Sequence, residues 1–253
     1  MKTIKNLLTT LALMAFTMTT FAQTKVIAHR GYWKTEGSAQ NSLRALIKAD
    51  SINCYGSEFD VWMTADGRLV VNHDAKVDGI VIEEAQSADV FGLKLGNGEY
   101  IPALEQYLEM GKSLNTRLIF ELKPHENRLR EAKAVIDGIM MIERMGLNDR
   151  VEYITFSAAA LEEFLKYAPK GTPVYYLNGD KTPQELYRMG AAGIDYNLSV
   201  LKKHPEWIKE CHDLGMKVNV WTVNKEDDMK WCIGQGIDFI TTNEPELLQK
   251  LLK

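Results

Sequence analysis

Residues 56–62 read GSEFDVW, a short run in which the carboxylates of Glu58 and Asp60 flank the aromatic Phe59. Residues two apart on a strand point to the same face. If this run is a strand, Phe59 faces a layer of helices and the two carboxylates face the opposite way, towards an enclosed interior. We therefore expect a buried strand with one packing face and one face that carries chemistry.

Short apolar runs of the same kind alternate with amphipathic stretches along the chain. Seven further runs predict strands, at residues 26–29, 118–122, 151–155, 174–177, 193–196, 217–222 and 239–241. Helical patterns lie at residues 42–50, 103–112, 127–145, 158–167, 183–189, 205–214, 225–233 and 244–252. Eight strand–helix units predict an α/β fold, the (β/α)₈ TIM barrel. An open doubly wound sheet, the alternative, usually needs a glycine-rich phosphate loop after an early strand, and none is found.

One segment interrupts this alternation. Residues 68–73 predict an extra strand, and residues 74–100 form a long excursion before the next helical pattern. We interpret the excursion as a small insertion after the second barrel strand, over one rim of the barrel. No linker or low-complexity tract divides the rest, so residues 23–253 predict a single TIM-barrel domain with an insertion at about residues 74–100.

The N-terminus has the layout of an export signal. Residues 2–5 carry two lysines, residues 7–16 are apolar apart from two threonines, and a small-residue cleavage site ends at Ala22. A membrane anchor, the alternative, is disfavoured because a spanning helix needs about 20 apolar residues. A lipid anchor is disfavoured because no cysteine lies near the site. We expect residues 1–22 to be removed and the mature chain, residues 23–253, to be periplasmic or secreted.

The charge balance limits the partners. Lys2 and Lys5 leave with the signal, so 28 of the 30 basic residues face 34 acidic ones, a net charge of −6. This balance argues against nucleic acid or an anionic membrane as the main partner, because both attract basic surfaces. A small anionic substrate stays open, since it responds to the local field of its site.

The three cysteines are too few, and odd in number, for a disulfide framework. We interpret Cys54 as a buried free thiol, because it lies where the chain approaches a predicted strand. A single bridge between Cys211 and Cys232 stays open.

Polar side chains gather where predicted strands end, and barrel enzymes carry out their chemistry at the C-terminal ends of their strands. The second strand carries Glu58 and Asp60 on one face. The third ends in Glu121-Leu122-Lys123, which again puts Glu121 and Lys123 on one face. Three carboxylates and a lysine are therefore expected to meet at the mouth of one barrel.

Three clustered carboxylates repel one another, and some hold protons unless a cation neutralises them. Hard oxygen ligands suit Mg²⁺ or Ca²⁺ rather than zinc. The alternative is a salt-bridged network with Arg30 and Lys123. Because the carboxylates fall at neighbouring strand ends, Glu58, Asp60 and Glu121 predict a site for one divalent cation, Mg²⁺ or Ca²⁺.

Two histidines fall near the same strand ends. His29 closes the first strand and precedes Arg30, and His73 ends the extra strand and precedes Asp74. Imidazole titrates near neutral pH, so it can give or take a proton under working conditions. A single histidine at a strand end is often structural. Two histidines beside a divalent cation and basic residues suit phosphodiester cleavage, in which charge on the phosphoryl oxygens is stabilised while protons move.

The ordered set of motifs resembles the glycerophosphodiester phosphodiesterase family. The resemblance rests on AHRG at 28–31, QNSL at 40–43, EFDV at 58–61, HD at 73–74, IPALE at 101–105, ELK at 121–123, WTVN at 221–224 and GIDFITTNEP at 236–245. Each motif is short, but their ordered combination is specific and spans residues 26–247.

The resemblance implies a TIM barrel with a small inserted subdomain that hydrolyses glycerophosphodiesters to glycerol 3-phosphate and an alcohol, in glycerol and lipid metabolism. The site residues that it implies are an acid–base pair, three ligands of a divalent cation and three substrate contacts: His29 and His73; Glu58, Asp60 and Glu121; Arg30, Lys123 and Trp221. A core aromatic beneath the site is the alternative role of Trp221. The nucleophile stays open between water and the glycerol 2-hydroxyl.

Two positions depart from the family pattern. The family usually has Pro-Glu-Asn-Thr where residues 39–42 read AQNS, so Gln40 removes an acid near the first loop and bears on cation affinity or substrate choice. The family often has Asp where Asn243 stands, and we expect Asn243 to help cap the final helix. His125 follows a strand end, and we interpret it as a solvated loop residue rather than a substrate contact.

Two other functions are weighed against this one. A phospholipase-like phosphodiesterase acting on lipids needs an exposed apolar or basic loop at the barrel mouth, whereas residues 74–100 carry the acids Asp78, Glu83, Glu84 and Asp89. A non-catalytic secreted binding protein on a degenerate barrel is expected to lose a histidine or a ligand carboxylate, and all are present. The sequence carries no signal for the leaving alcohol or the oligomeric state.

Overall fold

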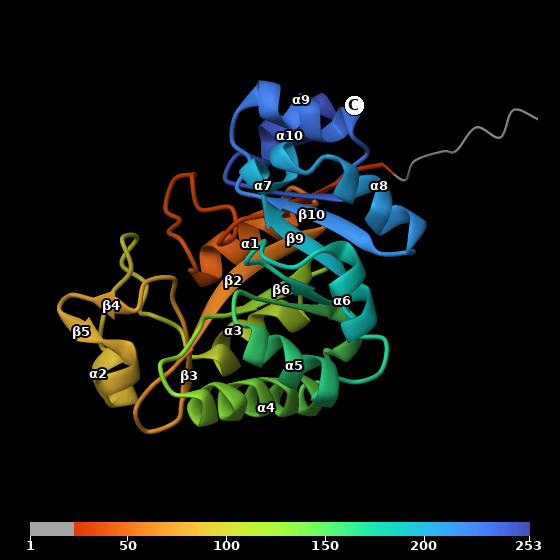
Figure 1. Ribbon diagram of the computed structural model, residues 1–253. Helices are drawn as coiled ribbons and strands as arrows, with labels where there is room; N and C mark the ends of the chain where they lie inside the picture. Colours follow the sequence, from red (N-terminus) through yellow and green to blue (C-terminus); the bar gives the residue numbers. More distant parts are fainter. Residues whose placement is uncertain (1–22) are drawn as a thin grey trace, which may run out of the picture.

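The computed structural model describes residues 23–253, and the predicted signal peptide, residues 1–22, lies outside the described residues. Eight parallel strands close into a barrel, because β1 pairs with both β2 and β11 (Figure 1). Around the barrel the strands are β1 (Lys25–Ala28), β2 (Gly56–Met63), β6 (Arg117–Leu122), β7 (Val151–Thr155), β8 (Val174–Tyr176), β9 (Gly193–Asn197), β10 (Lys217–Trp221) and β11 (Phe239–Thr242). The predicted TIM barrel is confirmed.

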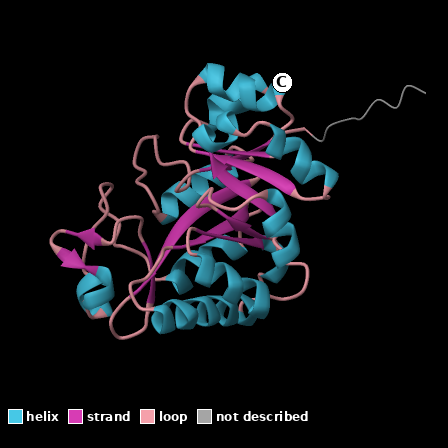
Figure 2. Ribbon diagram, viewed as in Figure 1, coloured by secondary structure: helices cyan, strands magenta, loops and turns pink. Residues whose placement is uncertain are grey.

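Helices lie around the strands on the outside of the barrel (Figure 2). Those at the predicted places are α1 (Leu43–Ser51), α3 (Leu104–Lys112), α4 (Arg128–Arg144), α5 (Ala158–Tyr167), α6 (Pro183–Met189), α8 (Glu206–Asp213), α9 (Glu226–Gly234) and α10 (Pro245–Leu251). One further helix of the barrel itself, α7 (Leu198–Lys203), was not predicted. It begins directly after β9, where the side chain of Asn197 accepts a hydrogen bond from the backbone N–H of Ser199.

The segment after β2 leaves the barrel and forms a small lobe beside it (Figure 1). Its first strand, β3 (Leu69–Val71), runs antiparallel to the end of β2. The lobe continues with β4 (Lys76–Val77), β5 (Ile80–Val81), a 3₁₀ turn at Ile82–Glu84 and α2 (Ser87–Phe91). A separate buried apolar cluster holds the lobe together; it contains Trp62, Val70, Ile82, Val90 and Ile101.

Phe59 lies between the barrel and its helices, as the alternation in β2 predicted. Its side chain is fully buried, and its ring centroid lies 4.4 Å from that of Tyr107 and 5.5 Å from that of Phe120. A second apolar cluster fills the inside of the barrel; it contains Ile27, Ile119, Ile154, Tyr175, Leu177 and Phe239. Two members of this cluster, Ile154 and Leu177, also line the pocket that holds the polar side chains described below.

All three cysteines are buried free thiols. The interpretation of Cys54 is therefore confirmed, and the bridge left open between Cys211 and Cys232 is not formed. Within residues 23–253, no helix is both long enough and apolar enough to cross a membrane.

Candidate active site

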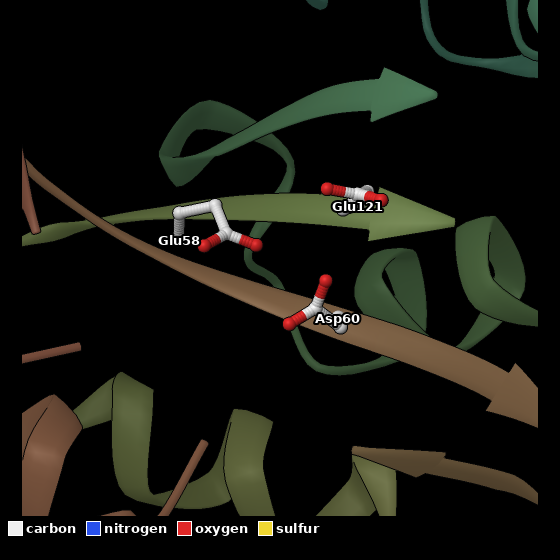
Figure 3. Close-up of side chains that lie close together, drawn as sticks. All are labelled: Glu58, Asp60 and Glu121. Atoms are coloured by element: carbon white, nitrogen blue, oxygen red, sulfur yellow. The ribbon is translucent and has the colours of Figure 1, made fainter. Parts of the chain in front are cut away.

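Three carboxylates meet inside the barrel, two from β2 and one from β6 (Figure 3). Asp60 and Glu121 are direct partners in the parallel pairing of these strands, and Glu58 lies one inward position earlier on β2. One oxygen atom from each side chain lies within 4.8 Å of the others. All three residues are buried, so the geometry brings together the set predicted from the sequence.

The cluster is electrostatically strained without a cation. Burial, followed by the charges of Asp60 and Glu121, raises the pKa of Glu58 well above its ordinary value. Burial and Asp60 raise the pKa of Glu121 to about 7. Burial also disfavours the Asp60 charge, but Lys123 and His73 outweigh it and lower the pKa of Asp60. At neutral pH the cluster therefore retains protons that a bound cation would displace.

The cluster is also bridged by basic side chains, as the alternative of a salt-bridged network anticipated. The Lys123 ammonium lies 2.7 Å from Glu121 Oε1 and 3.2 Å from Asp60 Oδ1. Glu58 is not satisfied by these bases. Its Oε2 accepts a hydrogen bond from the backbone N–H of Arg30 at 2.7 Å, and its Oε1 is buried without a hydrogen-bond partner. An unpaired buried carboxylate oxygen facing two other carboxylates fits a hard cation better than a closed ion-pair network.

The β1–α1 loop holds Arg30 against this cluster. Gly31 has a φ of +74°, and a Cβ atom there would lie 2.7 Å from the backbone carbonyl carbon of Ala45, so only glycine fits. Arg30 Nη1 donates a hydrogen bond to Gln40 Oε1 at 2.5 Å, and Arg30 Nε lies 3.8 Å from Asp60 Oδ2. Gln40 thus binds Arg30 without adding a negative charge, and Asp60 is the carboxylate with which Arg30 forms an ion pair.

Asn41 fixes the position of Asp60. Its Nδ2 donates to Asp60 Oδ2 at 2.8 Å, and its Oδ1 accepts from the Asp60 backbone N–H at 3.2 Å. Ser42, the next residue, accepts a hydrogen bond from the Ala45 N–H and begins α1. The segment of residues 40–42 therefore links the start of α1 to a side chain of the carboxylate cluster.

His29 is held by Asn243, which corrects the prediction that Asn243 caps the last helix. Glu244 is the N-cap residue of α10, and it makes no side-chain capping bond. Asn243 Oδ1 lies 2.9 Å from His29 Nδ1 and 2.9 Å from Trp33 Nε1. An indole N–H only donates, so the Asn243 atom is an acceptor and His29 Nδ1 carries the proton.

This bond leaves His29 Nε2 unprotonated and directed at the cluster, 3.9 Å from Glu58 Oε2. Burial, followed by the charge of Arg30, lowers the pKa of His29 to about 4. At neutral pH the imidazole is therefore neutral, with its basic nitrogen towards the carboxylates.

His73 is placed differently, at the more open side of the same pocket. A third of its side chain is exposed, and its Nδ1 lies 2.7 Å from Asp74 Oδ1. Its backbone carbonyl accepts a hydrogen bond from Trp62 Nε1 at 3.1 Å, which ties the segment after β3 to β2. The two histidines thus share one pocket in unequal settings, one enclosed and one near solvent.

One pocket collects these groups, with a cavity volume of about 100 Å³. It is lined by His29, Arg30, Glu58, His73, Glu121, Lys123, Ile154, Phe156, Leu177, Asp195, Trp221, Thr222 and Thr241. Trp221 is half-buried; its ring packs edge-on against Phe156, and its Nε1 donates to the backbone carbonyl of Asp195 at 2.9 Å. Trp221 therefore forms part of the pocket wall and is also anchored to β9.

His125 is neither solvated nor in the pocket, so its interpretation as a solvated loop residue is wrong. It is buried, its Nε2 accepts from the Met63 N–H at 3.0 Å, and its Nδ1 lies 2.7 Å from the Lys123 carbonyl oxygen. Both ring nitrogens are therefore used in holding the ends of β2 and β6 together. His125 is a structural residue.

Residues 29–247 match the glycerophosphoryl diester phosphodiesterase family. The chain belongs to this family. A glycerophosphodiester phosphodiesterase of Caldanaerobacter subterraneus subsp. tengcongensis is 30% identical over 254 residues, which cover 91% of this chain and 98% of that protein. The crystal structure of a glycerophosphodiester phosphodiesterase from Parabacteroides distasonis is 51% identical, with a TM-score of 0.90, and the match covers 91% of this chain and 97% of that one.

A third comparison shows the fold alone. An Oleispira antarctica phosphodiesterase, solved in complex with the product sn-glycerol-3-phosphate, is 23% identical with a TM-score of 0.76; the match covers 90% of this chain and 96% of that one. Membership of the glycerophosphoryl diester phosphodiesterase family confirms the predicted enzyme class, a hydrolase of glycerophosphodiesters. The alternative of a non-catalytic binding protein is set aside.

The sequence did not predict several residues of this site or their roles. The fixing of Asp60 by Asn41 and the orientation of His29 by Asn243 follow motifs that were noted, but neither role was assigned. Phe156 and Asp195 were not noted at all. Asp195 has a signal in retrospect, because an acid in the middle of the predicted strand 193–196 points inwards on the same alternation that placed Glu58 and Asp60.

Proposed function

We propose that this enzyme hydrolyses glycerophosphodiesters to glycerol 3-phosphate and an alcohol with the help of one divalent cation and the histidine pair His29 and His73. The observation that carries the proposal is the convergence of a buried three-carboxylate cluster, two histidines and two basic side chains on a single pocket. Anionic phosphodiesters need positive charge at their oxygens and a proton path on each side of the phosphorus. The pocket supplies side chains suited to both.

Glu58, Asp60 and Glu121 would hold the cation. Their all-oxygen donor set suits Mg²⁺ or Ca²⁺, and the unpaired Oε1 of Glu58 supplies a free ligand atom. When bound, the cation would stabilise negative charge on a phosphate oxygen. Arg30 and Lys123 would bind the remaining phosphate oxygens. Lys123 would be free to bind phosphate when a cation neutralises Glu121 and Asp60, with which it is paired in the structure.

His29 is the proposed general base. Its Nδ1–H is committed to Asn243, so the unprotonated Nε2 can accept the proton of the attacking hydroxyl. As that proton moves to Nε2, the nucleophile oxygen forms a bond to phosphorus. Both nucleophiles, water and the glycerol 2-hydroxyl, satisfy this step; the second would give a cyclic phosphate that water opens in a second step.

His73 is the proposed general acid. Asp74 accepts from its Nδ1, which leaves Nε2–H to protonate the departing alcohol as the bond from phosphorus to the leaving oxygen breaks. A shallow hollow begins beside His73 and runs towards the inserted lobe; it is lined by residues that include Trp33, Gln40, Asn72 and Leu95. We assign this hollow to the leaving alcohol. The proton gained by His29 and the proton lost by His73 are exchanged with solvent between turnovers.

The proposed substrate is a small, water-soluble diester and not a lipid at a membrane surface. The inserted lobe lies on the side of the leaving alcohol and carries Asp78, Glu83, Glu84 and Asp89. These acids oppose binding to an anionic membrane. The signal-like residues 1–22 support export to the periplasm or secretion, where the mature enzyme would meet deacylated phospholipid headgroups.

The test is the release of glycerol 3-phosphate from a panel of deacylated glycerophosphodiesters, with chelator and after separate restoration of Mg²⁺ or Ca²⁺. Loss on chelation and recovery with one cation would support the proposal and identify the metal. His29→Ala and His73→Ala should each abolish turnover and leave the fold intact. Turnover close to wild type in either variant would overturn the roles of the histidines. No release of glycerol 3-phosphate across the panel with cation present would overturn the proposed substrate class in favour of a lipid phosphodiesterase.

A further inference from the structure

Asp195 is a buried acid that the mechanism above does not use. It lies on β9, which stands four strands from β2 around the closed barrel, on the wall opposite Glu58 and Asp60. Only 1% of the residue is exposed, and it lines the catalytic pocket. Its Oδ1 is buried without a hydrogen-bond partner. An unpaired buried carboxyl oxygen costs stability, so its retention at a pocket wall needs a reason.

Asp195 is part of a polar patch within an otherwise apolar wall. It pairs in register with Asn219 on β10, and Asn219 hydrogen-bonds Thr241 of β11 at 3.1 Å. Asn219 and Thr241 are each only 4% exposed. Ile154, Leu177 and the rings of Phe156 and Trp221 line the rest of this side. We call Asp195, Asn219 and Thr241 the polar floor, since they lie deeper than the histidines and the basic side chains.

The depth of each group orients the substrate, given the function proposed above, on which this step rests. The side chains of Arg30, Lys123 and His73 are 19%, 11% and 33% exposed, whereas Asp195 is 1% exposed. The phosphate therefore binds beside Arg30 and Lys123, across the barrel from Asp195. The variable alcohol has to leave towards solvent past His73, so the glycerol end of the diester enters the closed part of the pocket.

We infer that Asp195 is a specificity-determining residue whose free carboxyl oxygen hydrogen-bonds the terminal hydroxyl of the glycerol moiety. The polar floor surrounds that hydroxyl at the closed end of the pocket, and the aromatic and aliphatic side chains beside it pack against the carbon atoms of the glycerol. A hydroxyl is the right partner because it both donates and accepts. Burial, followed by the nearby charge of Glu121, raises the pKa of Asp195 well above its ordinary value, and a side-chain hydrogen bond with Asn219 opposes this shift. In either charge state the free Oδ1 can accept the hydrogen bond of the hydroxyl.

This role gives the enzyme a reason to prefer deacylated diesters. A pocket that hydrogen-bonds a substrate hydroxyl rejects an analogue that lacks it, because the buried protein group is then left unpaired. A glycerol whose terminal oxygen carries an acyl chain has no proton to donate and is too large for the closed end. Selection against lysophospholipids would then occur at Asp195, far from the leaving group.

The test compares binding of glycerol 3-phosphate with binding of 2-hydroxypropyl phosphate, which lacks only the terminal hydroxyl. Dissociation constants are measured by calorimetry with Mg²⁺ or Ca²⁺ present, for the wild type and for Asp195→Leu, which has nearly the same shape. The wild type should prefer glycerol 3-phosphate by about tenfold or more. In Asp195→Leu the ratio should fall to about one, with the affinity for the analogue retained. The melting temperature of the variant should stay close to that of the wild type, because removal of the buried carboxyl is offset by loss of its hydrogen bond with Asn219.

Two further variants complete the test of Asp195. If Asp195→Leu folds poorly, Asp195→Asn tests the same bond; it keeps the size and a polar head group and should retain part of the preference for glycerol 3-phosphate. Glu152→Gln removes a carboxylate from the barrel interior outside the pocket, where Glu152 is bound by Tyr55 and Arg117, and should leave the ratio unchanged.

The inference is overturned if Asp195→Leu keeps the wild-type preference, or if it weakens both ligands equally, since an ordered water or a structural role would then account for Asp195. Failure of the proposed function looks different: the wild type itself would then neither bind glycerol 3-phosphate nor release it from any diester.

Discussion

Replacement of Asn243 by Ala tests the orientation of the catalytic base most directly. The Asn243 side-chain oxygen accepts from two donors, His29 Nδ1 and Trp33 Nε1, each at 2.9 Å. The two partners lie 214 and 210 residues away in the sequence, so this one oxygen joins the first loop of the barrel to its last. In Asn243→Ala the imidazole loses the bond that keeps its proton on Nδ1, and the ring is free to turn.

The magnitude follows from the groups left without partners. A buried donor without an acceptor costs about 1–3 kcal/mol. Both donors are only partly buried, so water recovers some of this energy, and we expect the free energy of unfolding to fall by about 2 kcal/mol. For a chain of this size that corresponds to a melting temperature lower by about 4–8 °C. Loss of an orienting partner of a functional imidazole typically costs about 10–100-fold, so kcat should fall by this factor while KM changes little.

The assay measures the release of glycerol 3-phosphate at saturating substrate and cation, together with a thermal melt of each variant. Trp33→Phe is the comparison variant, because it removes the second donor and leaves the bond between His29 and Asn243 in place. Since Trp33 also lines the hollow assigned to the leaving alcohol, its substitution should act mainly on KM, and its kcat should fall by less than that of Asn243→Ala. Asn243→Asp keeps an acceptor at the same place and should retain more activity than Asn243→Ala. A wild-type kcat in Asn243→Ala, or an equal loss in Trp33→Phe, would refute the assigned role of Asn243.

Three other outcomes are expected. The rise in melting temperature that Mg²⁺ or Ca²⁺ produces should grow from about pH 5 to about pH 8. Protons compete with the cation until the pH passes the pKa of Glu121, about 7. Thermal denaturation measures this rise, and a constant rise across the range would count against the carboxylate site. Gln40→Glu should raise KM by about 2–10-fold with little change in kcat, since the new carboxylate neutralises the Arg30 charge offered to the phosphate; an unchanged KM would show that Arg30 does not bind it. Phe120→Ala should lower the free energy of unfolding by about 3–5 kcal/mol, because the fully buried ring packs on Phe59 and other aromatic rings; urea denaturation measures this, and a loss below about 1 kcal/mol would contradict the packing.

The fold followed from patterns that are local in the sequence. The alternation Glu58-Phe59-Asp60 placed one ring in the helix layer and two carboxylates inside, and the structure has this arrangement. The helix α7 was missed because it begins in the residue after β9 ends, so no loop signal separates the two elements. The inserted lobe was recognised only as an interruption, since strands of two residues, such as β4 and β5, are too short to show a period.

The candidate site was accessible to sequence reasoning only in part. Residue types at strand ends predicted the carboxylate cluster, because parallel strands of a closed barrel present their C-terminal ends at one mouth. The partners of those residues were not predictable in the same way. His125 has the same local signature as a site residue, a histidine just after a strand, yet its ring lies against Met63 and Lys123 outside the pocket.

By itself the sequence determined the period of each element, the barrel that eight such units form, and the kinds of side chain that face its axis. Those features depend on residues within a few positions of one another. Only the tertiary structure decided that Asn243 holds His29, that Glu58 retains an unpaired oxygen, and that Asp195 lies on the wall opposite the carboxylate cluster. These contacts arise when β11 pairs with β1 and closes the barrel, which brings together residues more than 200 positions apart whose distance no local pattern encodes.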